Sequence, residues 1–222
     1  MACGKAVALH LVEEINHRVV NEYAEAIASL NIVASRSDDD RVGRALALAI
    51  DRLHDHAEAH RALMPPRVPA DENLADYVGR ICRSFSRATL AARGLGLLLR
   101  IADVILPADR CWRIGLVVAE LIRNAARHGR FDADGHIAVH IAAQAGDVVC
   151  FVQDNGGPVG PVAPGRGQAL IRSLVADLGG MVEWSFTAKG CAAIARVPID
   201  VPLLDAGDGK DRHDRIADTI VQ

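Results

Sequence analysis

Apolar residues recur at steps of three, four or seven in the first third of the chain, the pattern of one helix face. One such stretch covers residues 7–33 and a second covers residues 41–63. The polar residues 35–40 between them break the pattern and offer several helix N-cap candidates. Two amphipathic helices joined by a short turn predict an antiparallel hairpin. The apolar positions expected in its core are Leu11, Ile15, Val19, Ala26, Leu30, Val33, Val42, Leu46, Ala49, Ile50, Leu53 and Ala57.

A single hairpin leaves a continuous apolar face uncovered. Pairing two copies into a four-helix bundle covers that face, so the sequence predicts a homodimer through the hairpin. The proline-rich residues 65–69 end the second helix and are typical of a linker. We therefore expect a first domain over residues 1–66.

The rest of the chain alternates between helix and strand patterns. Helices are expected over residues 73–92, 107–128 and 167–178, and strands over residues 95–101, 136–143, 148–153, 181–186 and 191–199. Strands paired by hairpins with helices layered on them predict an α+β fold. This second domain is expected over residues 70–200, followed by a polar tail at 201–222.

Composition and charge narrow the function classes. Half of the 222 residues are hydrophobic, and the net charge of −3 comes from intermixed signs, which argues against a nucleic-acid surface. No apolar run reaches the roughly 20 residues of a membrane helix, and the N-terminus lacks a signal-peptide core. The five cysteines are widely spaced, so we expect free thiols in a reducing cytoplasm and no separate sensor domain within these 222 residues.

The stretch of residues 116–129 carries polar side chains within an otherwise apolar helix pattern. Glu120 and Asn124 are four residues apart and share one face, and Arg127 and His128 follow one turn later. A carboxylate, an amide and a cation in one row can hold a hydrated magnesium ion and phosphate oxygens. The alternative is a core helix with its polar edge in water, and this motif alone favours that alternative.

Two glycine-containing motifs follow. Asp154, Asn155 and Gly156 come directly after a predicted strand, where an acid beside glycines can reach a ligand. Gly165 and Gly167 precede a predicted helix, where exposed backbone N–H groups favour phosphate. Each motif alone is equally typical of a turn or loop, but the three motifs together are far more specific.

In order and content the three motifs resemble the ATP-binding domain shared by histidine kinases, gyrase and Hsp90. Residues 120–125 resemble its N-box, residues 154–156 its G1 box and residues 165–167 its G2 box. The resemblance implies an α/β sandwich with a mixed, mainly antiparallel sheet. It also implies that Asn124 binds magnesium, that Asp154 accepts a hydrogen bond from the adenine amine, and that the two loop glycines lie near the phosphates.

His17 lies in the first predicted helix between the apolar positions Ile15 and Val19, on the outer face. Glu14 precedes it by three residues, and a carboxylate beside an imidazole can take its proton as a phosphoryl group arrives. The alternative is an ordinary surface histidine. The segment Glu14–Asn21 resembles the H-box of the histidine kinase subfamilies known as HWE and HisKA_2, which implies that His17 is the phosphoacceptor.

Two function hypotheses follow. In the first, the chain is a two-component histidine kinase core that uses ATP and Mg²⁺ to phosphorylate His17 and passes the phosphoryl group to a response-regulator receiver domain. In the second, it is a histidine phosphotransferase with a vestigial ATP site. The proline at position 158, where the family usually has glycine, and a short proline-rich segment before Gly165 favour the second. A third reading, a non-catalytic dimeric adaptor, has no specific support.

The cluster His54, His56 and His60 permits a metal-site interpretation, because the last two are one helical turn apart. No acid or cysteine cluster accompanies them in the sequence. A solvated helix edge is therefore the expectation for all three.

Overall fold

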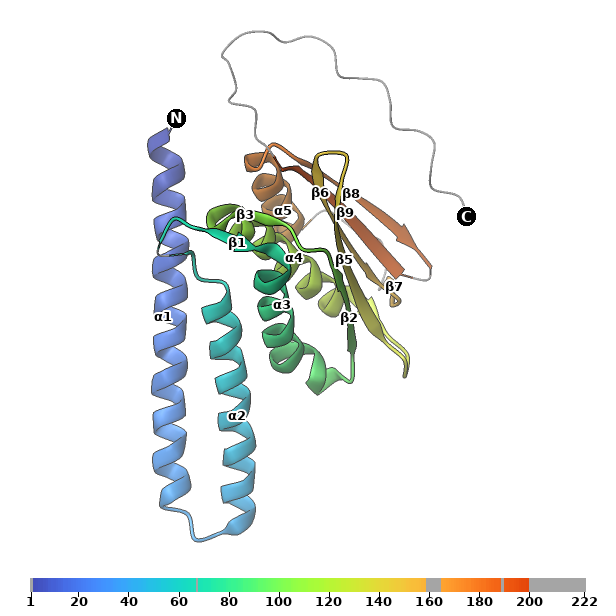
Figure 1. Cartoon of the computed structure of the whole chain (residues 1–222). Helices are drawn as coiled ribbons and strands as arrows, with labels where there is room; N and C mark the ends of the chain where they lie inside the picture. The colour runs from blue at the N-terminus through green and yellow to red at the C-terminus, as the bar shows by residue number, and fades with distance from the viewer. Residues whose placement is uncertain (1, 67, 159–164, 189, 200–222) are drawn as a thin grey trace.

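The computed structural model describes residues 2–66, 68–158, 165–188 and 190–199. A helical hairpin stands beside an α/β unit in which helices lie against a sheet (Figure 1). The helices are α1 (Ala2–Ser35), α2 (Asp40–Ala62), α3 (Leu74–Phe85), α4 (Ala108–His128) and α5 (Arg166–Asp177), and a π-helical turn (Ser86–Leu90) and a 3-10 turn (Ala91–Arg93) extend α3. The strands are β1 (Asp71–Asn73), β2 (Gly96–Ile101), β3 (Ile105–Pro107), β4 (Gly129–Arg130), β5 (His136–Gln144), β6 (Asp147–Asp154), β7 (Gly157–Pro158), β8 (Met181–Thr187) and β9 (Gly190–Pro198).

The predicted hairpin is confirmed. Helix α1 packs along α2, and the side chain of Asp39 caps α2 by accepting a 2.7 Å hydrogen bond from the backbone N–H of Arg41. Ile15 and Val33 of the predicted apolar stripe are 51% and 53% exposed within one chain, in line with the expectation that a single hairpin leaves an apolar face uncovered. Helix α2 covers only one stripe of α1, the stripe that contains the buried Ile27.

The main sheet has five strands in the order β2-β5-β6-β9-β8. Only the β2–β5 pair is parallel, and the other three pairs are antiparallel. The predicted mixed, mainly antiparallel sheet is therefore confirmed. Helices α3, α4 and α5 contact the sheet and cover one of its faces (Figure 1).

The core lies between this helix layer and the sheet. Ile122 of α4, Ile171 of α5, and Ile137 and Ile141 of β5 are all fully buried in this layer. Small and β-branched side chains fill most of this layer, as the low aromatic content requires. Their burial supplies the main stabilising term and fixes the direction in which α4 presents its polar residues.

Two short ladders were not predicted from the sequence. Strand β1 pairs antiparallel with β3, and β4 pairs antiparallel with β7. Each has only two or three residues on a strand, which is too short for an alternating hydrophobic pattern to identify. The β4–β7 ladder matters for function because it joins the end of α4 to the segment after Asp154.

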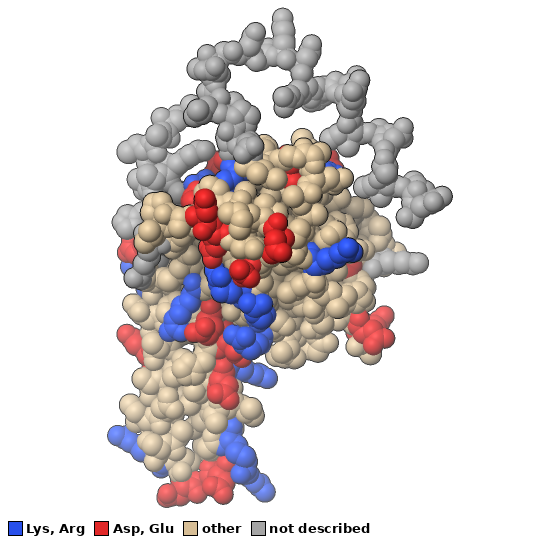
Figure 2. Space-filling view, viewed as in Figure 1, with Lys and Arg blue, Asp and Glu red and all other residues tan. Residues whose placement is uncertain are grey.

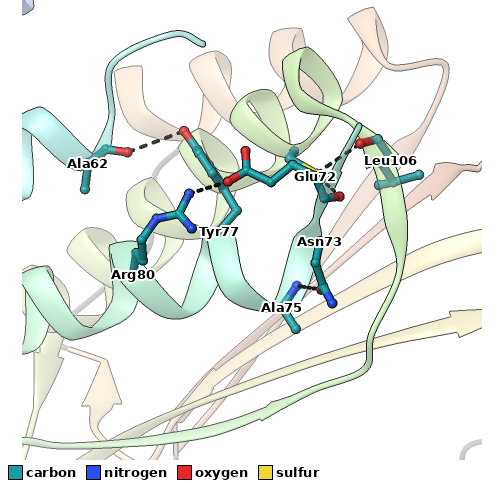
Figure 3. Close-up of polar contacts among 8 residues, drawn as sticks. Ala62, Glu72, Asn73, Ala75, Tyr77, Arg80 and Leu106 are labelled. Carbon is teal, nitrogen blue, oxygen red and sulfur yellow. Dashed lines mark hydrogen bonds and ion pairs between the residues drawn. The ribbon is translucent and has the colours of Figure 1, made fainter. Parts of the chain in front are cut away.

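The junction between hairpin and sheet unit is held by polar contacts (Figure 3). The Tyr77 hydroxyl of α3 donates to the carbonyl of Ala62 at 3.4 Å, while Arg80 pairs with Glu72. Asn73 caps α3 with its side-chain oxygen. Burial raises the pKa of the Tyr77 phenol, so the hydroxyl stays protonated and able to donate.

Charged side chains of both signs alternate over the face seen in Figure 2, in line with the intermixed charge of the sequence. Within the described part of the chain, no helix has the length and apolar character needed to cross a membrane. Three of the cysteines there are buried as free thiols, and burial raises the pKa of Cys82 and Cys150 to about 12. These thiols are therefore core residues rather than nucleophiles.

Candidate functional site

The first element of the site is the C-terminal half of α4. Glu120 and Asn124 lie one turn apart on it, and Glu120 Oε2 forms an ion pair of 2.6 Å with Arg123 Nη1. The side-chain nitrogen of Asn124 is buried and has no hydrogen-bond partner among the described atoms. Arg127 and His128 are exposed in the last turn of the helix. A buried amide without a partner indicates a position that a ligand completes.

The second element is the end of β6. Asp154 is only 3% exposed, and its Oδ1 accepts hydrogen bonds from the backbone N–H groups of Gly156 at 3.0 Å and Cys191 at 3.3 Å. Burial raises the pKa of Asp154 above its ordinary value, although these two backbone hydrogen bonds lower it in part. Both of these donors lie at Oδ1.

The third element is the start of α5. Gly165 is the N-cap residue and has no side-chain cap, so the first-turn N–H groups have no side-chain acceptor there. A Cβ added at Gly167 would lie 2.6 Å from Glu120 Oε1 and 3.0 Å from both Asn124 side-chain polar atoms. The backbone of the second glycine motif therefore lies directly against the polar face of α4, and a side chain at position 167 would displace the side chains of Glu120 and Asn124.

The fold brings the three predicted motifs together around the end of α4. Gly167 contacts Glu120 and Asn124, and a Cβ built at Gly156 would lie 3.0 Å from the Cα of Gly129, the residue that follows α4. Asp154 lies two residues before Gly156. The three motifs thus lie around one end of α4, where the sequence predicts the nucleotide site.

This site fits ATP and Mg²⁺. Asn124 and Glu120 provide an amide and a carboxylate, the oxygen donors that magnesium takes when most of its shell is water and phosphate. The uncapped start of α5 provides N–H groups for phosphate, and Asp154 provides a buried acceptor for an amine. The close approach of Gly167 to Glu120 and Asn124 is the structural observation that carries this fit, and the unpartnered Asn124 Nδ2 is a donor for a phosphate oxygen.

His17 lies on α1, whereas the residues of this site lie on α4, at the end of β6 and at the start of α5. Its side chain is exposed on α1, and Glu14 one turn earlier forms an exposed ion pair of 3.2 Å with Arg18. Helix α2 packs against both α1 and α3 and so separates the His17 helix from the sheet unit (Figure 1). Within one chain, this arrangement does not bring His17 to the Asn124 site.

The expectation of a solvated helix edge for the histidines of α2 is wrong for two of them. His56 stacks on Tyr23 of α1 with ring centroids 6.1 Å apart, and the His60 ring lies 5.7 Å from the same tyrosine. Burial, then the Arg123 guanidinium, lowers the pKa of His60. His54 is exposed as expected. The aromatic contact depends on the register of α1 against α2, which the sequence does not reveal.

Sequence reasoning missed the loop that supports the site. Phe131, in the segment between α4 and β5, packs beside Gly129, Gly135 and Gly156. Asn155 bonds the same segment through its side-chain amide. A single phenylalanine between glycines in a polar stretch was the available signal, but its partners become neighbours only in the folded chain.

Position 158 belongs to β7 and pairs in register with Gly129. The backbone of this proline therefore belongs to the short β4–β7 ladder that follows Asp154, rather than to an open loop. The proline-rich segment compared with the family's lid continues through residues 159–164, which lie outside the described residues. The predicted tail at 201–222 lies outside them as well.

The described chain thus combines a helical hairpin, a mixed α/β sandwich and a polar site at the end of α4. The model of the histidine kinase-like ATPase domain matches residues 72–190, and a histidine kinase model matches residues 14–89. The chain belongs to the histidine kinase-like ATPase family, and its residues 14–89 match the histidine kinase model HisKA_2.

Individual relatives agree with this class. The chain is 26% identical to blue-light-activated histidine kinase 1 of Erythrobacter litoralis over 86% of its own length, but it spans only 54% of that protein. The structure of the histidine kinase domain of the EL346 protein of Erythrobacter litoralis has a TM-score of 0.56 at 22% identity, covering 79% of this chain and 96% of that domain. A structure described as a bacterial phosphotransferase has a TM-score of 0.60 at 14% identity, covering 86% of this chain and 96% of that one. The two structural likenesses show the shared fold alone.

Proposed function

We propose that the chain binds ATP·Mg²⁺ at the Asn124 site, phosphorylates His17 and then donates the phosphoryl group to an aspartate of a response-regulator receiver domain. The observation that carries this proposal is the contact of Gly167 with Glu120 and Asn124, because it aligns a phosphate-binding helix start with oxygen donors for magnesium.

Each predicted residue has a role in this proposal. Asn124, with Glu120 beside it, holds the magnesium ion, which when bound neutralises charge on the phosphate oxygens. The backbone at Gly165 and Gly167 receives the phosphates, and Arg127 and His128 add positive charge at the rim. Asp154 accepts the adenine amine, and Gly156 lets the base approach.

The transfer step places a ring nitrogen of His17 in line with the γ-phosphorus. The new N–P bond forms as the bond between the γ-phosphorus and the bridging oxygen breaks, and ADP leaves. The imidazole loses its proton, which Glu14 accepts. In the second step a receiver aspartate takes the phosphoryl group from His17.

His17 lies on α1, which packs on α2, whereas the Asn124 site lies on α4, so one of two arrangements is needed. Either the sheet unit moves off α2, or the nucleotide serves His17 of a second copy. Exposed apolar side chains on the hairpin, including Ile15, Val42 and Leu48, support pairing of two hairpins into a four-helix bundle. The proposed division is a phosphotransfer hairpin at 1–66, an ATP-binding domain at 70–200 and a tail at 201–222. Free cysteines and the need for ATP fit a cytoplasmic location.

The test is incubation of the purified chain with Mg²⁺ and γ-labelled ATP, followed by detection of acid-labile label. We expect label on the wild-type chain, none on His17→Ala, and none on Asn124→Ala. Because the Asn124 side-chain nitrogen has no partner, Asn124→Ala should keep the wild-type melting temperature. Label that persists on His17→Ala would contradict the assignment of the phosphoacceptor.

The phosphotransferase alternative keeps His17 but not ATP turnover. The departure at position 158 from the family's glycine is the observation in its favour. Transfer from a phosphorylated receiver to His17, together with no measurable ATP binding, would establish this alternative over the kinase.

A further inference from the structure

The ring of Phe131 occupies a space that three glycines leave open. A Cβ built at Gly129 would lie 2.6 Å from Phe131 Cε2, and one built at Gly156 would lie 3.0 Å from Phe131 Cε1. At Gly135 the added atom would lie 2.6 Å from Phe131 Cβ. Any side chain at these three positions would collide with the phenylalanine, so ring and glycines are matched in shape.

Asn155 forms hydrogen bonds with the segment that contains Phe131 and leads into β5. Its Oδ1 accepts from the backbone N–H of His136 at 2.7 Å, and its Nδ2 donates to the carbonyl of Asp134 at 3.1 Å. The backbone N–H of Asn155 also donates to the carbonyl of His136 at 3.2 Å. Together with the β4–β7 ladder, these contacts tie the segment after β6 to the segment that leads from α4 into β5.

The supported segment controls the orientation of Asp154. Gly156, which contacts Phe131, donates its backbone N–H to Asp154 Oδ1 at 3.0 Å. A shift of Gly156 therefore moves one of the two donors that hold this oxygen. We propose that Phe131 and Asn155 are positioning residues for purine selection, holding Gly156 so that Asp154 presents its second oxygen to a 6-amino purine. This inference rests on the proposed ATP site and adds the residues that determine its preference for adenine.

The physical basis is the difference between the two purines at position 6. Adenine carries an amine there, which donates to a carboxylate, whereas guanine carries an oxygen, which meets the carboxylate as a second acceptor. Asp154 is 3% exposed, so water cannot relieve a mismatch. Selection of this kind depends on a fixed carboxylate direction and is lost when the carboxylate can rotate.

The experiment measures dissociation constants of the full chain for ATP·Mg²⁺ and GTP·Mg²⁺ by calorimetry, together with the melting temperature. The variants are Phe131→Leu and Asn155→Asp, the latter keeping the acceptor of Asn155 but removing its donor. Phe131→Tyr keeps the ring as a conservative variant. Matched controls are Phe151→Leu, on β6, and Asn31→Asp, on the exposed surface of α1.

We expect the wild type and both controls to bind ATP more tightly than GTP. In Phe131→Leu and Asn155→Asp the ratio of the two dissociation constants should fall about tenfold, the size of one buried hydrogen bond. Phe131→Tyr should retain it. Equal weakening for both nucleotides, or an unchanged ratio, overturns the inference while leaving the proposed ATP site in place. A wild-type chain without ATP preference also overturns it, and one that binds neither nucleotide overturns the proposed function as well. If Phe131→Leu does not fold, Asn155→Asp decides.

Discussion

The indole Nε1 of Trp112 donates a 2.9 Å hydrogen bond to the backbone carbonyl of Leu63, and both residues are buried. Trp112 lies on α4, the helix that carries Glu120 and Asn124, and Leu63 is the C-cap residue of the hairpin helix α2. This bond ties α4, the helix of the proposed ATP site, directly to the helical hairpin. It is accompanied by an ion pair of 3.1 Å between Arg87 and Asp55 of α2.

Replacing Trp112 by phenylalanine should destabilise the docked arrangement. The substitution leaves the Leu63 carbonyl buried without its donor, which costs about 1–3 kcal/mol. Urea denaturation followed by circular dichroism measures this loss. The matched control is Trp184→Phe on β8, where the indole is only half-buried, and an equal loss there would contradict the role of the hydrogen bond.

Replacing Gly167 by alanine should weaken ATP binding with a modest effect on folding. The added methyl group would lie 2.6 Å from Glu120 Oε1, so Glu120 and Asn124 must move from the positions proposed for magnesium and phosphate. We expect the dissociation constant for ATP to rise at least about tenfold, which calorimetry would measure. Gly43→Ala on α2 is the control: its added methyl meets nothing within 4 Å, and alanine should stabilise that helix by about 0.5–1 kcal/mol.

Replacing Asp154 by asparagine should separate stability from function. Burial raises the pKa of Asp154, because the folded chain favours the protonated carboxyl group. This group therefore stabilises the folded state below the ordinary pKa of 3.8, and the stabilisation is lost as the pH rises through the raised pKa of the folded chain. Asparagine can still accept from Gly156 and Cys191 but carries no buried charge. At pH 7.5 the variant should therefore melt at or above the wild-type temperature and fail to bind ATP. A lower melting temperature would contradict the cost assigned to the charge.

The folded protein should lose stability in mild acid through His60. Its pKa is lowered from 6.5, so the unfolded chain takes up the proton first as the pH falls through 6.5, and the folded state becomes less stable below that pH. The groups that face this ring are Arg123 of α4, His56 of α2 and Tyr23 of α1. His60→Gln should reduce the drop in melting temperature between pH 7.5 and 5.5.

The control for this measurement is His54→Gln, an exposed position on the same helix. If His54→Gln and His60→Gln reduce the acid-induced drop equally, the buried ring is not its source. A wild-type chain with the same melting temperature at both pH values would contradict the prediction outright.

The pattern of apolar positions determined most of the architecture. The two hairpin helices, helix α4 and the strands of the main sheet follow from local periodicity, because each is long enough to express its own repeat. The composition of the site was also readable, since the polar residues of α4 and the two glycine motifs stand out from apolar surroundings. The sequence also predicted the turn between β5 and β6, where Ala145 and Gly146 adopt positive φ.

Tertiary structure decided what lies next to what. That Gly167 rests on Asn124, that Phe131 fills a space left by glycines, and that Tyr23 covers His60 all depend on contacts between residues far apart in the chain. Such contacts follow from the packing of whole helices and strands, which no local pattern encodes. The sequence by itself predicted the residues of an ATP site on α4 and a phosphoacceptor on α1, and only the folded chain showed that α1 packs on α2 while α4 packs on α3.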